Sequence, residues 1–236
     1  MTTVSQSHIG LVRKENEDNL YVDEALGLYI VADGMGGHEN GALASQLAVQ
    51  TFVDSVNKAH LSIPELDTMR HMLNRANDVI YRYQKNGTGN IMGTTFTAAW
   101  IFNSTLSIAH IGDSRAYLIN KNDIKQITND HSYFAELARL GEFDSEQLVQ
   151  TGQRNVLIKA LGPEEHAEAQ YEQFELFPDQ TLLLCTDGLY NMVSDEEMHK
   201  IIMEASNLVE AKSCLLAMAL ERGGYDNITL VIYRHE

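Results

Sequence analysis

Five aspartates in this sequence stand where an apolar run begins or ends: Asp18, Asp33, Asp113, Asp187 and Asp226. Asp33 follows the run LYIVA and Asp187 follows TLLLCT, and each is followed directly by a glycine. One aspartate in such a position is usually a turn former or a helix cap. Five of them at the edges of expected core strands predict a cleft into which several carboxylates project.

Carboxylates gathered without basic partners repel one another, and bound cations relieve that repulsion. Sites made only of oxygen ligands select hard ions such as Mg²⁺ or Mn²⁺ rather than zinc. A glycine next to a ligand, as Gly34 is to Asp33, lets a backbone carbonyl or a water molecule approach the metal. The aspartate pattern therefore predicts a site for divalent cations.

Arg13 is the basic residue placed to share this cleft, because it lies four and five residues before Glu17 and Asp18. Its planar guanidinium matches a pair of phosphate oxygens. The other interpretation is a surface arginine paired with Glu15 or Glu17, and the local sequence leaves both open.

The elements that must position these residues are mostly short strands, rich in Thr, Val, Ile, Tyr and Phe. The sequence pattern predicts a strand at each end of the chain. The strands that the pattern predicts lie at 19–23, 27–33, 93–102, 104–112, 114–120, 123–128, 171–177, 180–187 and 227–234.

Helical spacing of apolar residues predicts two early helices, at 39–58 and 64–85, and two late ones, at 194–205 and 207–224. The third begins with a Ser and a Glu at capping-box spacing, and the fourth ends on two glycines, a common helix stop. Strands grouped apart from paired helices predict a layered α+β domain rather than alternating β-α-β units.

The composition is that of an ordinary globular protein, with 236 residues, 44% hydrophobic and 21% charged. A net charge of −16 repels phosphate backbones and disfavours nucleic acid as a partner. Cys185 and Cys214 form no C-x-x-C pair, which argues against a disulfide framework or a zinc site. No secretory signal or membrane span is recognisable, so we expect a cytoplasmic protein that does not engage membranes.

Eight motifs follow one another along the chain: VRKENEDN, VADGMGGH, GTTFTAAW, HIGDSRAYLI, ITNDHS, NVLIKALG, LLLCTDGL and GGYDNITLVIY. In this order they resemble the metal-dependent protein phosphatases of the protein phosphatase 2C (PPM) family, in its compact bacterial form. The resemblance spans Arg13 to Tyr233. It implies one catalytic domain over 1–236, of α+β class: a β-sandwich of two antiparallel sheets flanked by pairs of antiparallel helices.

The resemblance also implies an activity. A protein serine/threonine phosphatase of this kind uses a water that bridges two metal ions to attack the phosphomonoester directly, without a phosphoenzyme. Its substrates would be phosphoserine and phosphothreonine proteins, and a cognate Ser/Thr kinase would be its opponent. We expect a monomer that uses Mn²⁺ or Mg²⁺, with two core ions and a weaker third ion.

The resemblance assigns Asp33 as the ligand that bridges the two core metals. The Gly34 carbonyl would bind one of them, and Asp187 and Asp226 would bind the other. Asp113, together with Asp187, would hold the third ion.

Two further residues of the implied site would not bind metal themselves. Asp18 would hold metal-bound water, and Arg13 would bind the phosphate of the substrate. Both are therefore predicted to act in catalysis.

The chain departs from the family pattern in two places. Met35 stands directly after Asp-Gly, where many eukaryotic relatives carry a histidine as candidate general acid, and His38 lies three residues later. Thr151 and Gly152 replace a His-Pro of many bacterial relatives, within a flap-like segment, 132–162. The general acid and the role of this segment stay open.

Other enzyme classes fit less well. A cysteine phosphatase needs Cys-x5-Arg, but Asn191 and Leu220 stand at the arginine positions after the two cysteines. The stretch 34–41 lacks both the third glycine of a dinucleotide fingerprint and the lysine of a P-loop. Two alternatives remain: a binding protein that keeps the fold without catalysis, and a metal-dependent hydrolase of small phosphoesters.

Overall fold

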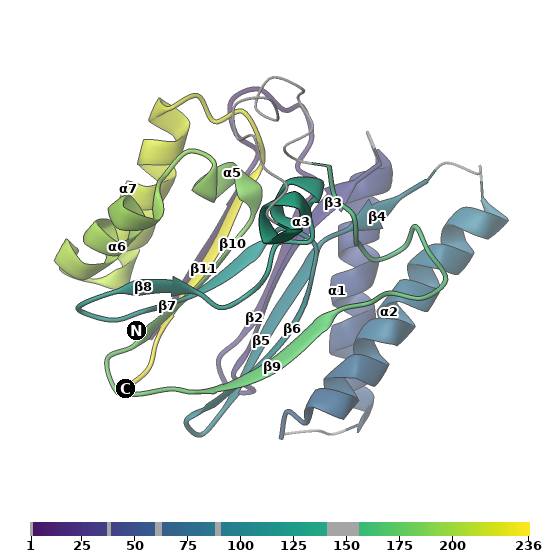
Figure 1. The fold of residues 1–236 in the computed structure, drawn as a ribbon, viewed down its shortest axis with the longest axis horizontal. Helices are drawn as coiled ribbons and strands as arrows, with labels where there is room; N and C mark the ends of the chain where they lie inside the picture. The colour runs from purple at the N-terminus through teal and green to yellow at the C-terminus, as the bar shows by residue number, and fades with distance from the viewer. Residues whose placement is uncertain (1, 37–38, 60–62, 88–90, 141–155) are drawn as a thin grey trace.

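Two antiparallel β-sheets face each other in this computed structural model, which describes residues 2–36, 39–59, 63–87, 91–140 and 156–236 (Figure 1). The first sheet has the strand order β1-β11-β10-β7-β8. The second has the order β2-β3-β5-β6-β9, with β4 paired to β3. The strands are β1 (Thr3–His8), β2 (Asp18–Asp23), β3 (Leu28–Met35), β4 (Gly93–Thr94), β5 (Phe96–Phe102), β6 (Thr105–Ile111), β7 (Arg115–Ile119), β8 (Ile124–Gln126), β9 (Gln170–Glu175), β10 (Thr181–Cys185) and β11 (Ile228–Arg234).

Helix pairs cover the outer faces of the two sheets, as Figure 1 shows. The helices are α1 (Glu39–Ala59), α2 (Leu66–Asn86), α3 (Tyr133–Leu140), α5 (Asp187–Tyr190), α6 (Asp195–Glu204) and α7 (Leu208–Glu221). α1 and α2 pack on the second sheet, whereas α6 and α7 pack on the first. The predicted α+β sandwich flanked by helix pairs is confirmed.

Strand β3 explains why the run before Asp33 is apolar at every position. Leu28 and Ile30 pack in the cluster that also contains residues of α1 and α2, while Tyr29 and Val31 pack between the two sheets. Successive side chains of a strand point to opposite faces. A strand buried on both faces therefore needs an apolar residue at each position.

A third packing layer lies between the first sheet and its helices. Cys185 of β10 and Ile232 of β11 pack there with Ile202 of α6 and Leu215 of α7. Cys185 is fully buried and is a small core residue, whereas Cys214 is exposed.

The helix ends agree with the capping residues in the sequence, except at the start of α2. Ser194 and Glu197 form the predicted capping box at the start of α6. The second helix begins at Leu66, not at Pro64, because Glu65 has the extended conformation of the N-cap. The buried face of α2 ends at Ile80, and Tyr83 in the last turn is exposed.

Some of the sequence predictions fall on residues that the structure does not describe. His38, Thr151 and Gly152 lie outside the described residues, as does much of the segment 132–162. The described start of that segment forms α3. Within the described part of the chain, no helix combines the length and the apolar character that a membrane crossing needs.

Candidate metal and substrate-binding site

Both sheets bring aspartates to the same site. In the second sheet, Asp18 begins β2 and is the register partner of Asp33 near the end of β3. Asp113 follows β6 of the same sheet. In the first sheet, Asp187 follows β10 and Asp226 precedes β11. The predicted position of these residues at strand ends is therefore confirmed.

A cavity of about 510 Å³, here called the catalytic cavity, brings most of the predicted residues together. Its wall includes Arg13, Asp33, Gly34, Asp113, Asp187 and Asp226. Asp18 is not part of this wall; it lies beside Asp33 in the sheet and is 8% exposed. The structure thus gathers residues that are more than 200 positions apart in the chain.

Burial and mutual repulsion raise the pKa of four of these carboxyl groups, those of Asp18, Asp33, Asp113 and Asp187. Burial raises the pKa of Asp18 to about 7, and the charges of Asp187 and Asp226 add to the shift. Burial likewise raises the pKa of Asp187 to about 7 and that of Asp113 to about 6. The pKa of Asp33 is raised well above its usual value by burial and by the other four aspartates. Protons or cations are needed to stabilise such a group of carboxyls.

The donor chemistry of the cavity fits hard divalent cations. Oδ1 of Asp18 and Oδ1 of Asp187 are buried and have no hydrogen-bond partner among the described residues. Such oxygens are costly unless a cation or water binds them. The described residues hold no group of three or more His, Cys, Asp or Glu side chains already placed to bind a metal. Sharing one ion would therefore require these carboxylates to turn toward it.

Two of the cavity aspartates accept hydrogen bonds from side chains. Nη2 of Arg13 donates to Oδ2 of Asp226 at 2.7 Å, and Nδ2 of Asn191 donates to Oδ2 of Asp187 at 3.2 Å. The Arg13 side chain is 48% exposed. The ion pair that the structure shows for Arg13 therefore joins it to a predicted metal ligand and places its guanidinium on the cavity wall.

Close backbone contact explains the glycines that follow two of the aspartates. A Cβ atom on Gly34 would lie 2.0 Å from the carbonyl oxygen of Gly41, and one on Gly188 would lie 2.0 Å from that of Asn227. No side chain fits at such distances. These glycines let α1 pack on β3 and α5 pack on β11, a role that the sequence did not reveal.

Asn227 was not predicted from the sequence to have a role, yet its hydrogen bonds hold the loop between β1 and β2, which carries Arg13. Its Nδ2 donates to the carbonyl oxygens of Ile9 at 2.9 Å and Glu15 at 3.0 Å, and its Oδ1 accepts the N–H of Glu17 at 2.8 Å. The side chain is buried, and these partners lie 210 to 218 positions away. No local pattern could have indicated this role.

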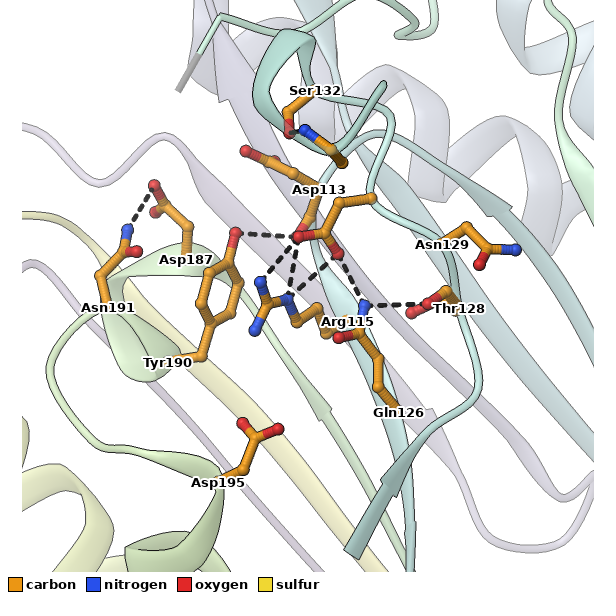
Figure 2. A network of polar contacts seen from close by, with 12 residues as sticks. Asp113, Arg115, Gln126, Thr128, Asn129, Ser132, Asp187, Tyr190, Asn191 and Asp195 are labelled. Atoms are coloured by element: carbon orange, nitrogen blue, oxygen red, sulfur yellow. Dashed lines mark hydrogen bonds and ion pairs between the residues drawn. The ribbon is translucent and has the colours of Figure 1, made fainter. Parts of the chain in front are cut away.

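A second charged group, the Arg115 network, lies beside Asp113 and joins β7, β8 and α5. Arg115 donates to Asp130 through Nη2 at 2.7 Å and through Nε to both carboxylate oxygens at 3.1 Å, and Gln126 also donates to Asp130. The Arg115 guanidinium stacks on the ring of Tyr190, with 3.7 Å between Cζ and the ring centroid (Figure 2). The Tyr190 hydroxyl donates to the backbone oxygen of Asp113 at 3.0 Å, which ties the network to the cavity.

Comparison with known sequences agrees with the resemblance. The sequence model of the family described as protein phosphatase 2C matches residues 7–221. The serine/threonine phosphatase stp of Listeria welshimeri is 39% identical over 230 residues, which cover 94% of this chain and 91% of that protein. The protein phosphatase PhpP of Streptococcus pneumoniae is 32% identical over 235 residues, covering 95% of this chain and 93% of that protein.

Solved structures share the whole architecture. The serine/threonine phosphatase PstP/Ppp of Mycobacterium tuberculosis has a TM-score of 0.87 and 32% identity, covering 99% of this chain and 98% of that chain. The catalytic domain of PstP in complex with two manganese ions has a TM-score of 0.84 and 32% identity, covering 98% of this chain and 96% of that chain. Sequence motifs, fold and relatives agree, and the chain belongs to the protein phosphatase 2C family of metal-dependent phosphoprotein phosphatases.

Proposed function

We propose that this chain hydrolyses phosphoserine and phosphothreonine monoesters in proteins and thereby reverses a serine/threonine kinase. The observation that carries the proposal is the catalytic cavity, whose wall combines four aspartates with Arg13. The single catalytic domain over 1–236, the monomeric state and the cytoplasmic location expected from the sequence belong to the same proposal.

The residues of the cavity fit two Mn²⁺ or Mg²⁺ ions. Asp33, the Gly34 carbonyl, Asp187 and Asp226 would hold them, and Asp113 with Asp187 would hold a third, weaker ion. Bound divalent cations lower the pKa of water and offset the negative charge of phosphoryl oxygens. The buried, unpartnered oxygen of Asp187 supports this assignment.

Asp18 would orient a water molecule, and Arg13 would bind the phosphoryl group of the substrate. Oδ2 of Asp18 accepts a hydrogen bond from the Thr186 hydroxyl at 2.9 Å, which leaves Oδ1 to orient a water molecule beside Asp33. Arg13 donates to Asp226 through Nη2. A guanidinium has five N–H donors, so Arg13 can also bind a phosphoryl oxygen without leaving Asp226.

The side chains of the site favour water over a cysteine as the nucleophile. Cys185 lies in the core, where burial raises the pKa of its thiol and keeps it protonated. Cys214 lies on α7 and is not part of the cavity wall. In the proposed hydrolysis the oxygen of water bonds to phosphorus and the bond to the seryl or threonyl oxygen breaks. The leaving oxygen takes a proton, whose donor is unassigned.

The direct test is phosphate release from a phosphothreonine peptide. We expect turnover only with Mn²⁺ or Mg²⁺, loss of turnover in EDTA, and recovery when Mn²⁺ is restored. Calorimetric titration and thermal unfolding give a readout besides activity, because an ion that binds the folded state raises its Tm.

Each alternative predicts a different result. Full activity in excess chelator would contradict the proposal. Turnover of p-nitrophenyl phosphate with none of phosphopeptides would favour a hydrolase of small phosphoesters. Mn²⁺ binding without turnover of either substrate would favour a binding protein that keeps the fold.

A further inference from the structure

A second cavity adjoins the catalytic cavity and shares part of its wall. This side pocket has a volume of about 480 Å³, and Met35 and Leu157 line both cavities. The two cavities are therefore direct neighbours at Met35 and Leu157.

Seven of the eleven residues that line the side pocket are apolar. Its apolar residues include Met35, Ile111, Leu157, Ile158, Ala160 and Pro163. Ile111 is fully buried and forms part of the floor. The polar residues of the wall are Lys159, Glu164, His166 and Glu168, and Nζ of Lys159 pairs with Oε2 of Glu168 at 2.9 Å. The four aspartates and Arg13 of the catalytic cavity have no counterpart here, so the side pocket suits an apolar side chain rather than a second phosphate.

The wall of the pocket is held in place by the rest of the fold. Leu161 and Thr94 exchange two backbone hydrogen bonds, at 2.9 and 3.0 Å. Asn77 of α2 is buried and hydrogen-bonds to the backbone of residues 162–165. A pocket formed in advance binds a side chain without the entropic cost of ordering its own wall.

We propose that the side pocket binds a large aliphatic or aromatic side chain of the substrate, close in sequence to the phosphorylated residue. The inference rests on the proposed function, which places the phosphorylated side chain in the catalytic cavity. A polypeptide substrate must then cross the rim formed by Met35 and Leu157.

The geometry of an extended peptide defines which substrate residue is selected. Side chains at positions i and i+2 point to the same face, roughly 6–7 Å apart, whereas the residue between them points away. When the phosphorylated side chain enters the catalytic cavity, the side chain two positions along the peptide toward the side pocket therefore points into the side pocket. The chain is a selective phosphatase for sites that carry an apolar residue there.

The test is a scan of phosphothreonine peptides in Mn²⁺. Leucine replaces alanine in turn at each of the three positions on either side of the phosphothreonine, in an otherwise alanine-rich peptide. We expect kcat/KM to rise about tenfold at one position only, two residues from the phosphothreonine, because burying several methylene groups stabilises binding. Lysine or glutamate at that position should give no gain.

Two variants connect the preference to the pocket. Ile158→Asp places a charge on the wall and Ala160→Leu fills the space, and both residues line the side pocket but not the catalytic cavity. Each should abolish the preference, measured as the ratio of kcat/KM for the leucine and alanine peptides. The matched control Ile63→Asp should keep it, because Ile63 is 53% exposed, against 43% for Ile158, and lines neither cavity.

The outcomes separate this inference from the proposed function. Metal-dependent turnover of all peptides without a leucine preference would overturn the inference alone. A preference that survives in both pocket variants would also overturn it, because the selective contact would then lie elsewhere. No turnover of any peptide would overturn the proposed function and the inference with it.

Discussion

Two neighbouring groups of acidic residues differ in how their charge is balanced. In the Arg115 network, Asp130 accepts three hydrogen bonds from Arg115 and one from Gln126. In the catalytic cavity, four aspartates share one cation, Arg13, among the described residues of the wall. The network is therefore neutralised by the protein itself, whereas the cavity needs cations from solution.

The two arginine–aspartate pairs also differ in burial. The side chains of Arg115 and Asp130 are 22% and 14% exposed, whereas those of Arg13 and Asp226 are 48% and 32% exposed. A partly buried, forked pair is costly to break, and an exposed single contact is easily exchanged. The Arg115–Asp130 pair is therefore structural, whereas the Arg13–Asp226 pair is open to exchange with ligands.

The sharpest test of this contrast is Asp33→Asn. With Mn²⁺ we expect turnover to fall at least ~10³-fold, because the proposed core ions lose the ligand that they share. In EDTA the same variant should be more stable than the wild type, because one of the crowded carboxylates is gone. Phosphopeptide kinetics and thermal unfolding measure the two effects. Near-normal turnover would rule out a shared ligand at this position.

Arg13→Ala should weaken substrate binding without affecting the metals. Loss of a charge-assisted contact to phosphate costs about 1.5–3 kcal/mol, which corresponds to a rise in KM of at least roughly tenfold. Calorimetric affinity for Mn²⁺ should stay close to that of the wild type. Arg13→Lys is the matched control, because it keeps the charge but not the planar fork. A collapse of Mn²⁺ affinity with an unchanged KM would make Arg13 a structural partner of Asp226.

Asp130→Asn should lower the stability of the fold while leaving metal binding largely unchanged. The change removes the negative charge that the partly buried Arg115 faces, at a cost of about 2 kcal/mol, or roughly 4–8 °C in Tm. In EDTA we expect the Tm of Asp130→Asn to fall below that of the wild type, whereas the Tm of Asp33→Asn should rise. An unchanged Tm would show that the fork contributes nothing to stability.

The smallest effect concerns the pH dependence of stability without metal. The carboxyls of Asp18 and Asp187 have a pKa of about 7 in the folded protein, against an ordinary value of 3.8. The folded state therefore binds more protons than the unfolded state, and the free energy of unfolding falls as the pH rises through 7. His110 and His131, whose pKa burial lowers to about 3 and about 4, act in the opposite sense below pH 6.5.

In EDTA we therefore expect Tm to rise by about 3 °C when the pH is lowered from about 8 to about 6.5. With saturating Mn²⁺ the trend should reverse, because protons compete with the metal for the carboxylates. Thermal unfolding at both pH values, with and without Mn²⁺, is the measurement. The same direction in both conditions would mean that these carboxyls do not bind the ions.

Local patterns were enough to predict most of the fold. The strand at 27–33 and the capping box at Ser194 depend on residues close together in the chain, and both predictions are confirmed. The short helices α3 and α5 were missed, because neither has the length at which helical periodicity becomes visible. The side pocket was also beyond prediction, since its walls come from β3, β6 and the segment before β9.

The sequence by itself determined which residues carry ligand chemistry and that each aspartate stands at the end of a strand, because an apolar run and the charged residue beside it are local features. Only the tertiary structure decided which of those carboxylates find a partner. Arg13 meets Asp226 across 213 positions, and Arg115 takes Asp130 rather than Asp113, two positions before it. Burial in that arrangement raises the pKa of Asp18, Asp33 and Asp187, because charges that water would solvate are enclosed together.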